Sequence, residues 1–114
     1  GQTPVSKYPM QFTQLPENQN GEKITSENIA SATSVTVKFL SETKTSGKMY
    51  LAFYDENGVL KYAKCNDVQT VIGENKVTFT DINISNVSSV KIFVWDGTLT
   101  PYTQSVIFGT GRND

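Results

Sequence analysis

The chain has 114 residues and a net charge of −1 at pH 7, from ten Lys and Arg against eleven Asp and Glu. This length suits one domain with a substantial core, and the balanced charge argues against a nucleic acid as the partner. No apolar run is long enough to cross a membrane. Histidine is absent, which excludes Ser-His-Asp and Cys-His catalysis and histidine-containing zinc sites. We therefore expect no enzyme activity, no metal and no cofactor.

Short alternating segments, separated by Gly, Asn, Asp and Ser, predict an all-β fold. Residues 1–23 hold three of the four prolines and the polar run PENQNGEK, which predicts a linker or a loosely attached N-terminal strand. Alternation then predicts strands in SVTVKF, KMYLAFY, KVTFTDINI and SVKIFV, with QSVIF closing the chain. A parity shift in KVTFTDINI predicts a bend near Thr80–Asp81. We expect an antiparallel β-sandwich over residues 24–109 and a polar tail over 110–114.

The segment YDENGVLKYA predicts a β-hairpin whose register can be counted from its turn. A type I turn over Asp55–Gly58, with Gly58 left-handed, gives a three-residue loop with a bulge. The core face is expected to carry the pairs Phe53–Lys61, Leu51–Ala63 and Met49–Cys65. The outer face is expected to carry the pairs Tyr54–Leu60, Ala52–Tyr62 and Tyr50–Lys64. In this register Cys65 is buried.

Three stretches, MYLAFYDENGVLKYAK, GENKVTFTDI and SSVKIFVWDGTLTPY, resemble a recurring immunoglobulin-like β-sandwich module, similar to a carbohydrate-binding module. Such modules occur in clostridial secreted polysaccharide-degrading enzymes and cell-surface proteins. The shared pattern is a strand ending in Y-D-x-x-G, a G-E-N turn, and V-K-x-F-x-W-D before a Pro-containing tail. It spans residues 48–102, with departures at Gly97, where Ser is commoner, and at Tyr102, where Leu is usual. The resemblance implies an extracellular, non-catalytic accessory module linked covalently to catalytic or cell-surface domains.

In an immunoglobulin-like sheet, the strand at residues 89–95 would lie beside the strand at 48–54. The outward residues of both strands and of the hairpin would then share one face. The predicted ligand-binding residues on this face are Tyr50, Tyr54, Tyr62, Lys64, Lys91, Phe93 and Trp95. Aromatic rings stack on the apolar faces of sugars, and lysines pair with uronic-acid carboxylates. The preferred function is binding of a plant or microbial cell-wall polysaccharide, with pectic, uronic-acid-containing chains among the candidates.

A different interpretation is a structural spacer or protein-contact module of a secreted multidomain protein. Trp95 belongs to the shared motif, so it can serve packing instead of a ligand. In that case the N-terminal run KYPMQF would cover the aromatic face with Tyr8, Met10 and Phe12. The exposure of the face separates the two interpretations.

Two clusters of acidic residues carry weaker hypotheses. Asp55, Glu56 and Asn57 have the chemistry of calcium ligands, but the hairpin turn explains their order better. Asp67 and Glu74 are a candidate carboxylate pair for glycosidase chemistry, a hypothesis that rests on composition alone.

Overall fold

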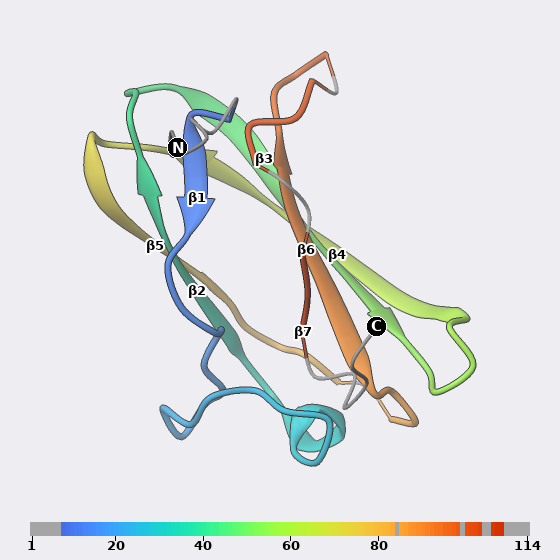
Figure 1. The fold of residues 1–114 in the computed structure, drawn as a ribbon. Coiled ribbons are helices and arrows are strands. Elements are labelled where there is room, and N and C mark those ends of the chain that lie inside the picture. The colour runs from blue at the N-terminus through green and yellow to red at the C-terminus, as the bar shows by residue number, and fades with distance from the viewer. Residues whose placement is uncertain (1–7, 84, 99, 104–105, 109–114) are drawn as a thin grey trace, which may run out of the picture.

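The structure is a computed structural model that describes residues 8–83, 85–98, 100–103 and 106–108. It contains two antiparallel sheets, which Figure 1 shows on opposite sides of the molecule. The three-stranded sheet has the order β1-β2-β5, and the four-stranded sheet has the order β4-β3-β6-β7. The strands are β1 (Met10–Phe12), β2 (Val35–Ser41), β3 (Ser46–Tyr54), β4 (Leu60–Gln69), β5 (Gly73–Phe79), β6 (Ser89–Trp95) and β7 (Val106–Phe108). The predicted all-β, antiparallel class is confirmed.

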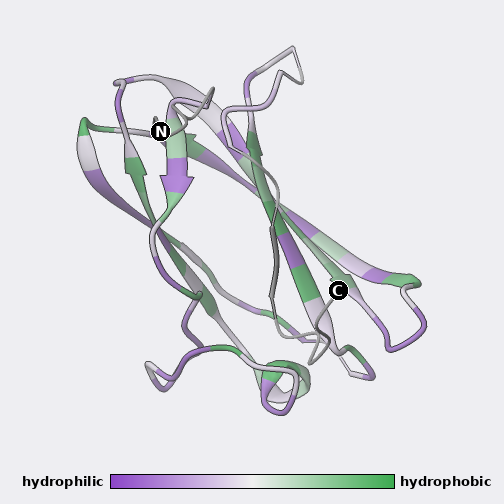
Figure 2. Cartoon of the chain, viewed as in Figure 1, coloured by the Kyte–Doolittle hydropathy of each residue, from purple (hydrophilic) through white to green (hydrophobic). Residues whose placement is uncertain are grey.

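Both sheets contribute one face to a shared core. The strands alternate buried and less buried residues, and Figure 2 shows the matching alternation of apolar and polar positions along them. Phe39, Phe53 and Phe79 are almost inaccessible to solvent. The remaining core residues of the strands are Met10, Val35, Val37, Met49, Leu51, Val68, Val90, Ile92 and Val94. Each large apolar side chain buried here contributes roughly 1.5–3 kcal/mol to folding.

The part of the N-terminal segment that the structure describes belongs to the fold. β1 pairs with β2 from Met10 to Phe12, and the Met10 side chain is only 1% exposed. Farther along, Glu17 and Thr36 exchange backbone hydrogen bonds of 2.9 and 2.8 Å. β1 is therefore an edge strand of the three-stranded sheet, and Glu17 adds an isolated bridge to β2. The proposed tail at 110–114 lies outside the described residues, as do residues 1–7.

The β3–β4 hairpin has the predicted turn but not the predicted register. Gly58 has a φ of 78°, and its backbone N–H donates to the Asp55 carbonyl at 3.0 Å. Tyr54 pairs with Leu60 as expected, but Phe53 then pairs with Tyr62, because the register shifts by one residue between Phe53 and Tyr54. Such a bulge moves every later β4 side chain to the opposite face of the sheet.

The shift makes the prediction for Cys65 wrong. Cys65 pairs with Tyr50 instead of Met49, and it is exposed. The predicted bend after the next strand is confirmed, since β5 ends at Phe79 and Asp81 adopts a φ of 57°. Beyond the bend Ile82 is buried, while Ile84 lies outside the described residues. Within the described part of the chain, no helix has the length and apolar character needed to span a membrane.

Candidate functional site

Three rings contact one another on the outer face of the four-stranded sheet, the face turned away from the core. The ring centroids of Phe93 and Trp95 lie 4.5 Å apart, those of Tyr50 and Trp95 5.1 Å, and those of Tyr50 and Phe93 5.3 Å. Tyr50 and Phe93 are stacked at 14°, and Trp95 is tilted against both. All three side chains are half-buried. We call these residues the aromatic cluster.

The pairing of β3 with β6 assembles the aromatic cluster. Met49 and Leu51 turn into the core, so Tyr50 between them turns outward. Its cross-strand partner is Phe93, and Trp95 is the next outward residue on β6. Cross-strand and diagonal neighbours are close enough for aromatic rings to touch. The predicted pairing of residues 48–54 with 89–95 is confirmed, and so is the outward position of these three rings.

Charged and small side chains surround the aromatic cluster. Lys91 lies on the same face opposite Ala52, so a small residue adjoins the rings on that side. Lys48 pairs with Trp95 on this face, and its ammonium group lies 2.6 Å from the Asp67 carboxylate. That contact raises the pKa of Lys48. Sequence reasoning missed Asp67 as a neighbour of the rings, because the bulge changes which β4 residues face outward.

The same bulge places Cys65 next to Tyr50 on the outer face. Desolvation raises the pKa of the Tyr50 hydroxyl above its ordinary value, and Cys65 adds to the shift. Like any tyrosine hydroxyl at neutral pH, this group is protonated and can donate or accept a hydrogen bond.

Of the other residues predicted for this face, Tyr54 is placed there and two are not. Tyr54 follows Tyr50 and Ala52 in the β3 alternation and pairs with Ser89. Tyr62, by contrast, packs against the core, with its ring centroid 5.8 Å from that of Phe53. Lys64 pairs with Leu51, and its ammonium group donates to the Thr80 carbonyl at the end of β5. The prediction that Tyr62 and Lys64 share the outer face is wrong.

The loop after Trp95 closes on itself and fixes the end of β6. One carboxylate oxygen of Asp96 accepts hydrogen bonds from the backbone N–H groups of Thr98 and Thr100 and from the Thr98 hydroxyl, each at 2.8 Å. These donors, the Thr100 N–H foremost, lower the pKa of Asp96. Trp95 forms a bridge with Pro101 on the far side of the loop. Asp96 therefore has a structural role in holding this loop.

Tyr102 ties the loop to the rest of the fold. Its backbone N–H donates to Val94 at 2.7 Å, and its carbonyl accepts from Met10 at 3.1 Å. Its ring packs against the core and lies close to Gly47, where an added Cβ would come within 2.9 Å of it and within 2.8 Å of the Trp95 carbonyl oxygen. Gly47 thus permits the close approach that positions the backbone of Trp95.

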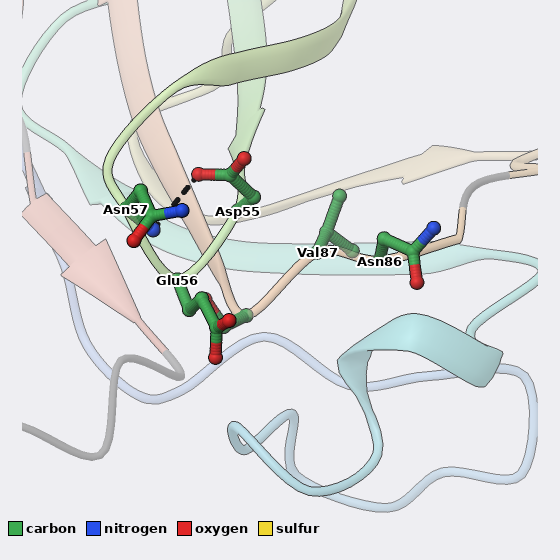
Figure 3. A pocket seen from close by; sticks show the side chains of 6 residues that line it. Asp55, Glu56, Asn57, Asn86 and Val87 are labelled. Carbon is green, nitrogen blue, oxygen red and sulfur yellow. Dashed lines mark hydrogen bonds between the residues drawn. The ribbon is translucent and has the colours of Figure 1, made fainter.

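The hairpin turn borders a hollow of about 340 Å³ that Figure 3 shows, lined by Asp55, Glu56, Asn57, Asn86, Val87 and Ser88. The Asp55 carboxylate is directed at the backbone of Asn57 and accepts from the N–H groups of Asn57 and Val59, both at 2.9 Å. This is the arrangement of an Asx turn. Within the described residues, no group of three or more Asp, Glu, Cys or His side chains could hold a metal ion.

Asp67 and Glu74 do not form the carboxylate pair considered above. Asp67 lies on the outer face of the four-stranded sheet beside Lys48. Glu74 lies on β5 opposite Leu40, on the outer face of the three-stranded sheet. The two carboxylates therefore project from different sheets.

The arrangement in the aromatic cluster supports stacking and hydrogen bonding, with lysines at its border.

Comparison with known proteins gives no relative from which a function could be transferred. No family model matches the sequence, and neither a curated protein sequence nor a solved structure matches the chain. The functional argument therefore rests on the geometry of the residues described above.

Proposed function

We propose that the chain is a non-catalytic carbohydrate-binding module that holds a plant or microbial cell-wall polysaccharide on its aromatic cluster. In this proposal the two sheets form an immunoglobulin-like β-sandwich. The module belongs to a secreted or cell-surface protein and is covalently linked to catalytic or cell-surface domains. The resemblance over residues 48–102 and the core shared by two antiparallel sheets support this assignment.

The observation that carries the proposal is the gathering of Tyr50, Phe93 and Trp95 on one outer face. Apolar ring surface that is left partly open to water favours binding of flat, weakly polar surfaces such as the C–H faces of pyranose rings. β1, which was a candidate to cover this face, pairs with β2 in the other sheet. Met10 and Phe12 therefore pack on the core instead of on the aromatic cluster.

Lysines at the border extend the proposed site toward acidic sugars. Lys91 is half-buried opposite Ala52, where its ammonium group can meet a uronic-acid carboxylate beside the rings. Lys48 is already paired with Asp67, so it contributes less charge to a ligand. The proposed ligand residues are Tyr50, Phe93, Trp95 and Lys91. Tyr54 shares the face but takes no part in the ring contacts of the cluster, so it is left out of the proposed site together with Tyr62 and Lys64.

Affinity gels with polygalacturonate, xylan, glucan and mannan test the proposal, followed by calorimetry on any polysaccharide that retards the protein. Loss of a stacked ring costs roughly 2 kcal/mol at a binding hot spot, so Tyr50→Ala should weaken binding about thirtyfold. The matched control is Tyr54→Ala, which removes a ring from the same strand and face without touching the cluster. It should weaken binding less than about threefold. Equal losses in both variants, or binding that survives Tyr50→Ala, would contradict the proposed site.

The second candidate is a spacer or protein-contact module, and one observation favours it. The centroids of the three rings lie within 4.5–5.3 Å of one another, so part of each ring surface is covered by the other two rings. Under this alternative the chain binds no polysaccharide in a broad screen, and removal of a ring from the cluster lowers stability alone.

A further inference from the structure

Two lysines lie directly opposite each other on the three-stranded sheet. Lys38 of β2 and Lys76 of β5 are cross-strand partners in the antiparallel register. Val37 and Phe39 on either side of Lys38 are buried, so both lysines belong to the outer face of this sheet. Directly opposed like charges are destabilising. The repulsion between the two ammonium groups therefore lowers the stability of the free protein, and a bound anion would offset it.

The protein compensates this charge only in part. Lys38 lies 3.7 Å from the Glu17 carboxylate, and Lys23 binds the other oxygen of the same carboxylate at 2.9 Å. The pKa of Glu17 is lowered, mainly by its hydrogen bond with Lys23. One acidic group is thus shared between two ammonium groups. In the described part of the chain, Lys76 makes no ion pair at all.

A hollow of about 240 Å³ lies at the lysine pair, lined by Lys38, Phe39, Glu74, Asn75 and Lys76. The Asn75 amide is already engaged with Val71 and Gly73, so the charged side chains of Lys38, Lys76 and Glu74 are the groups that face a ligand there. Glu74 faces Leu40 at one end of the hollow and bounds the site on that side. Thr36 and Thr78, the next outward pair along the two strands, hydrogen-bond to each other at 3.1 Å.

We propose that Lys38 and Lys76 form a second binding site, which takes an anionic group, a carboxylate or a sulfate, of an acidic polysaccharide. For an anion to contact both ammonium groups, Lys38 turns from Glu17, 3.7 Å away, toward Lys76. The anion then replaces the repulsion between the lysines with two charge-assisted contacts. The site lies on the opposite sheet from the aromatic cluster. The lysine pair by itself supports an anion site, whereas the choice of a polysaccharide as the carrier of the anion rests on the proposed function.

The test measures binding of polygalacturonate, which supplies carboxylates, and of dextran sulfate, which supplies sulfates, with neutral dextran as the baseline. If each lysine contact is worth about 0.7 kcal/mol, the double variant Lys38→Gln with Lys76→Gln loses affinity about tenfold. The control variant Lys44→Gln with Lys61→Gln changes the net charge equally and should lose less than about twofold. The acidic polymer that responds identifies the anionic group.

Stability and location distinguish this site from the aromatic cluster. Lys76→Gln relieves a like-charge pair, so the melting temperature should stay level or rise, and lost binding cannot be ascribed to unfolding. Amide resonances of Phe39 and Asn75 should shift on addition of the bound polymer, and Tyr50→Ala should leave these shifts unchanged. Equal affinity in the two double-lysine variants, or no binding of either acidic polymer, would overturn the proposal. In that event the lysines only place positive charge at the β5 edge of the sheet, which discourages this edge from pairing with a strand of another chain.

Discussion

The outer faces of the two sheets obey the same alternation but carry opposite chemistry. On the four-stranded sheet, Tyr50, Phe93 and Trp95 pack on one another. On the three-stranded sheet, the corresponding positions hold Lys38 and Lys76, and none of the ring contacts among the described residues lies on this face. Substitutions on the first face should therefore change stability as well as binding, whereas substitutions on the second should act through charge.

The largest expected effect tests what supports the aromatic face. Gly47→Ala places a Cβ 2.8 Å from the Trp95 carbonyl oxygen, a backbone atom that cannot rotate away. We expect a loss of about 3 kcal/mol in the free energy of unfolding, since overpacking costs up to that amount. Gly97→Ala is the matched control, because nothing lies within 4 Å of its added Cβ. Urea denaturation measures both variants, and equal stabilities would contradict the close approach at Gly47.

A direct contrast of the two faces comes next. Phe93→Ala removes the ring that touches both Tyr50 and Trp95, and a half-buried ring of this size is worth about 2 kcal/mol. Lys76→Ala on the other sheet should stay within about 0.5 kcal/mol of wild type. Thermal denaturation with near-ultraviolet circular dichroism reports both the stability and the packing of Trp95. If the two variants were equally stable, the aromatic rings would add no packing energy, and the two faces would differ only in polarity and charge.

The β3–β6 side of the aromatic face could be predicted from the sequence. Core residues alternate with outward residues in both strands, so alternation alone puts Tyr50 and Phe93 on one face. The β3–β4 side could not be predicted, although the turn at Gly58 was recognised. One extra residue in β4, at Lys61, changes the register, and a bulge depends on how the whole sheet twists and packs.

For the N-terminal segment, the sequence left a linker and a strand open for a different reason. β1 is three residues long, too short to display a period, and it lies among prolines and polar residues. Its place in the fold depends on Met10, which fills the core, and on Asn18, whose side-chain oxygen accepts from the backbone of Asn20 and Glu22. Composition shows that the segment is polar, but it does not show that Met10 is buried in the core or that Asn18 holds the local turn.

Cys65 offers a sharper test of where a ligand lies on the aromatic face. The thiol is exposed and belongs to the residue opposite Tyr50, so it should react readily with a maleimide in the native protein. A polysaccharide held on the aromatic cluster should slow the reaction severalfold, while Cys65→Ser should keep stability within about 0.5 kcal/mol. A labelling rate that ignores saturating polysaccharide would place the ligand elsewhere, and slow labelling of the free protein would contradict the bulged register.

The smallest expected effect concerns Asp96, which anchors the loop beside Trp95. Its pKa is lowered in the folded state, so its ionised form stabilises the fold above the unfolded value of about 3.9, and this contribution disappears as pH falls through the folded pKa. The stability difference between wild type and Asp96→Asn should therefore shrink from pH 5 toward pH 2.5. Thr98→Ala removes one of the three donors and should reduce this acid dependence in part. A difference that stays constant across this pH range would mean that the Asp96 charge contributes nothing to holding the loop, because only an ionised carboxylate that accepts these bonds links loop stability to protons.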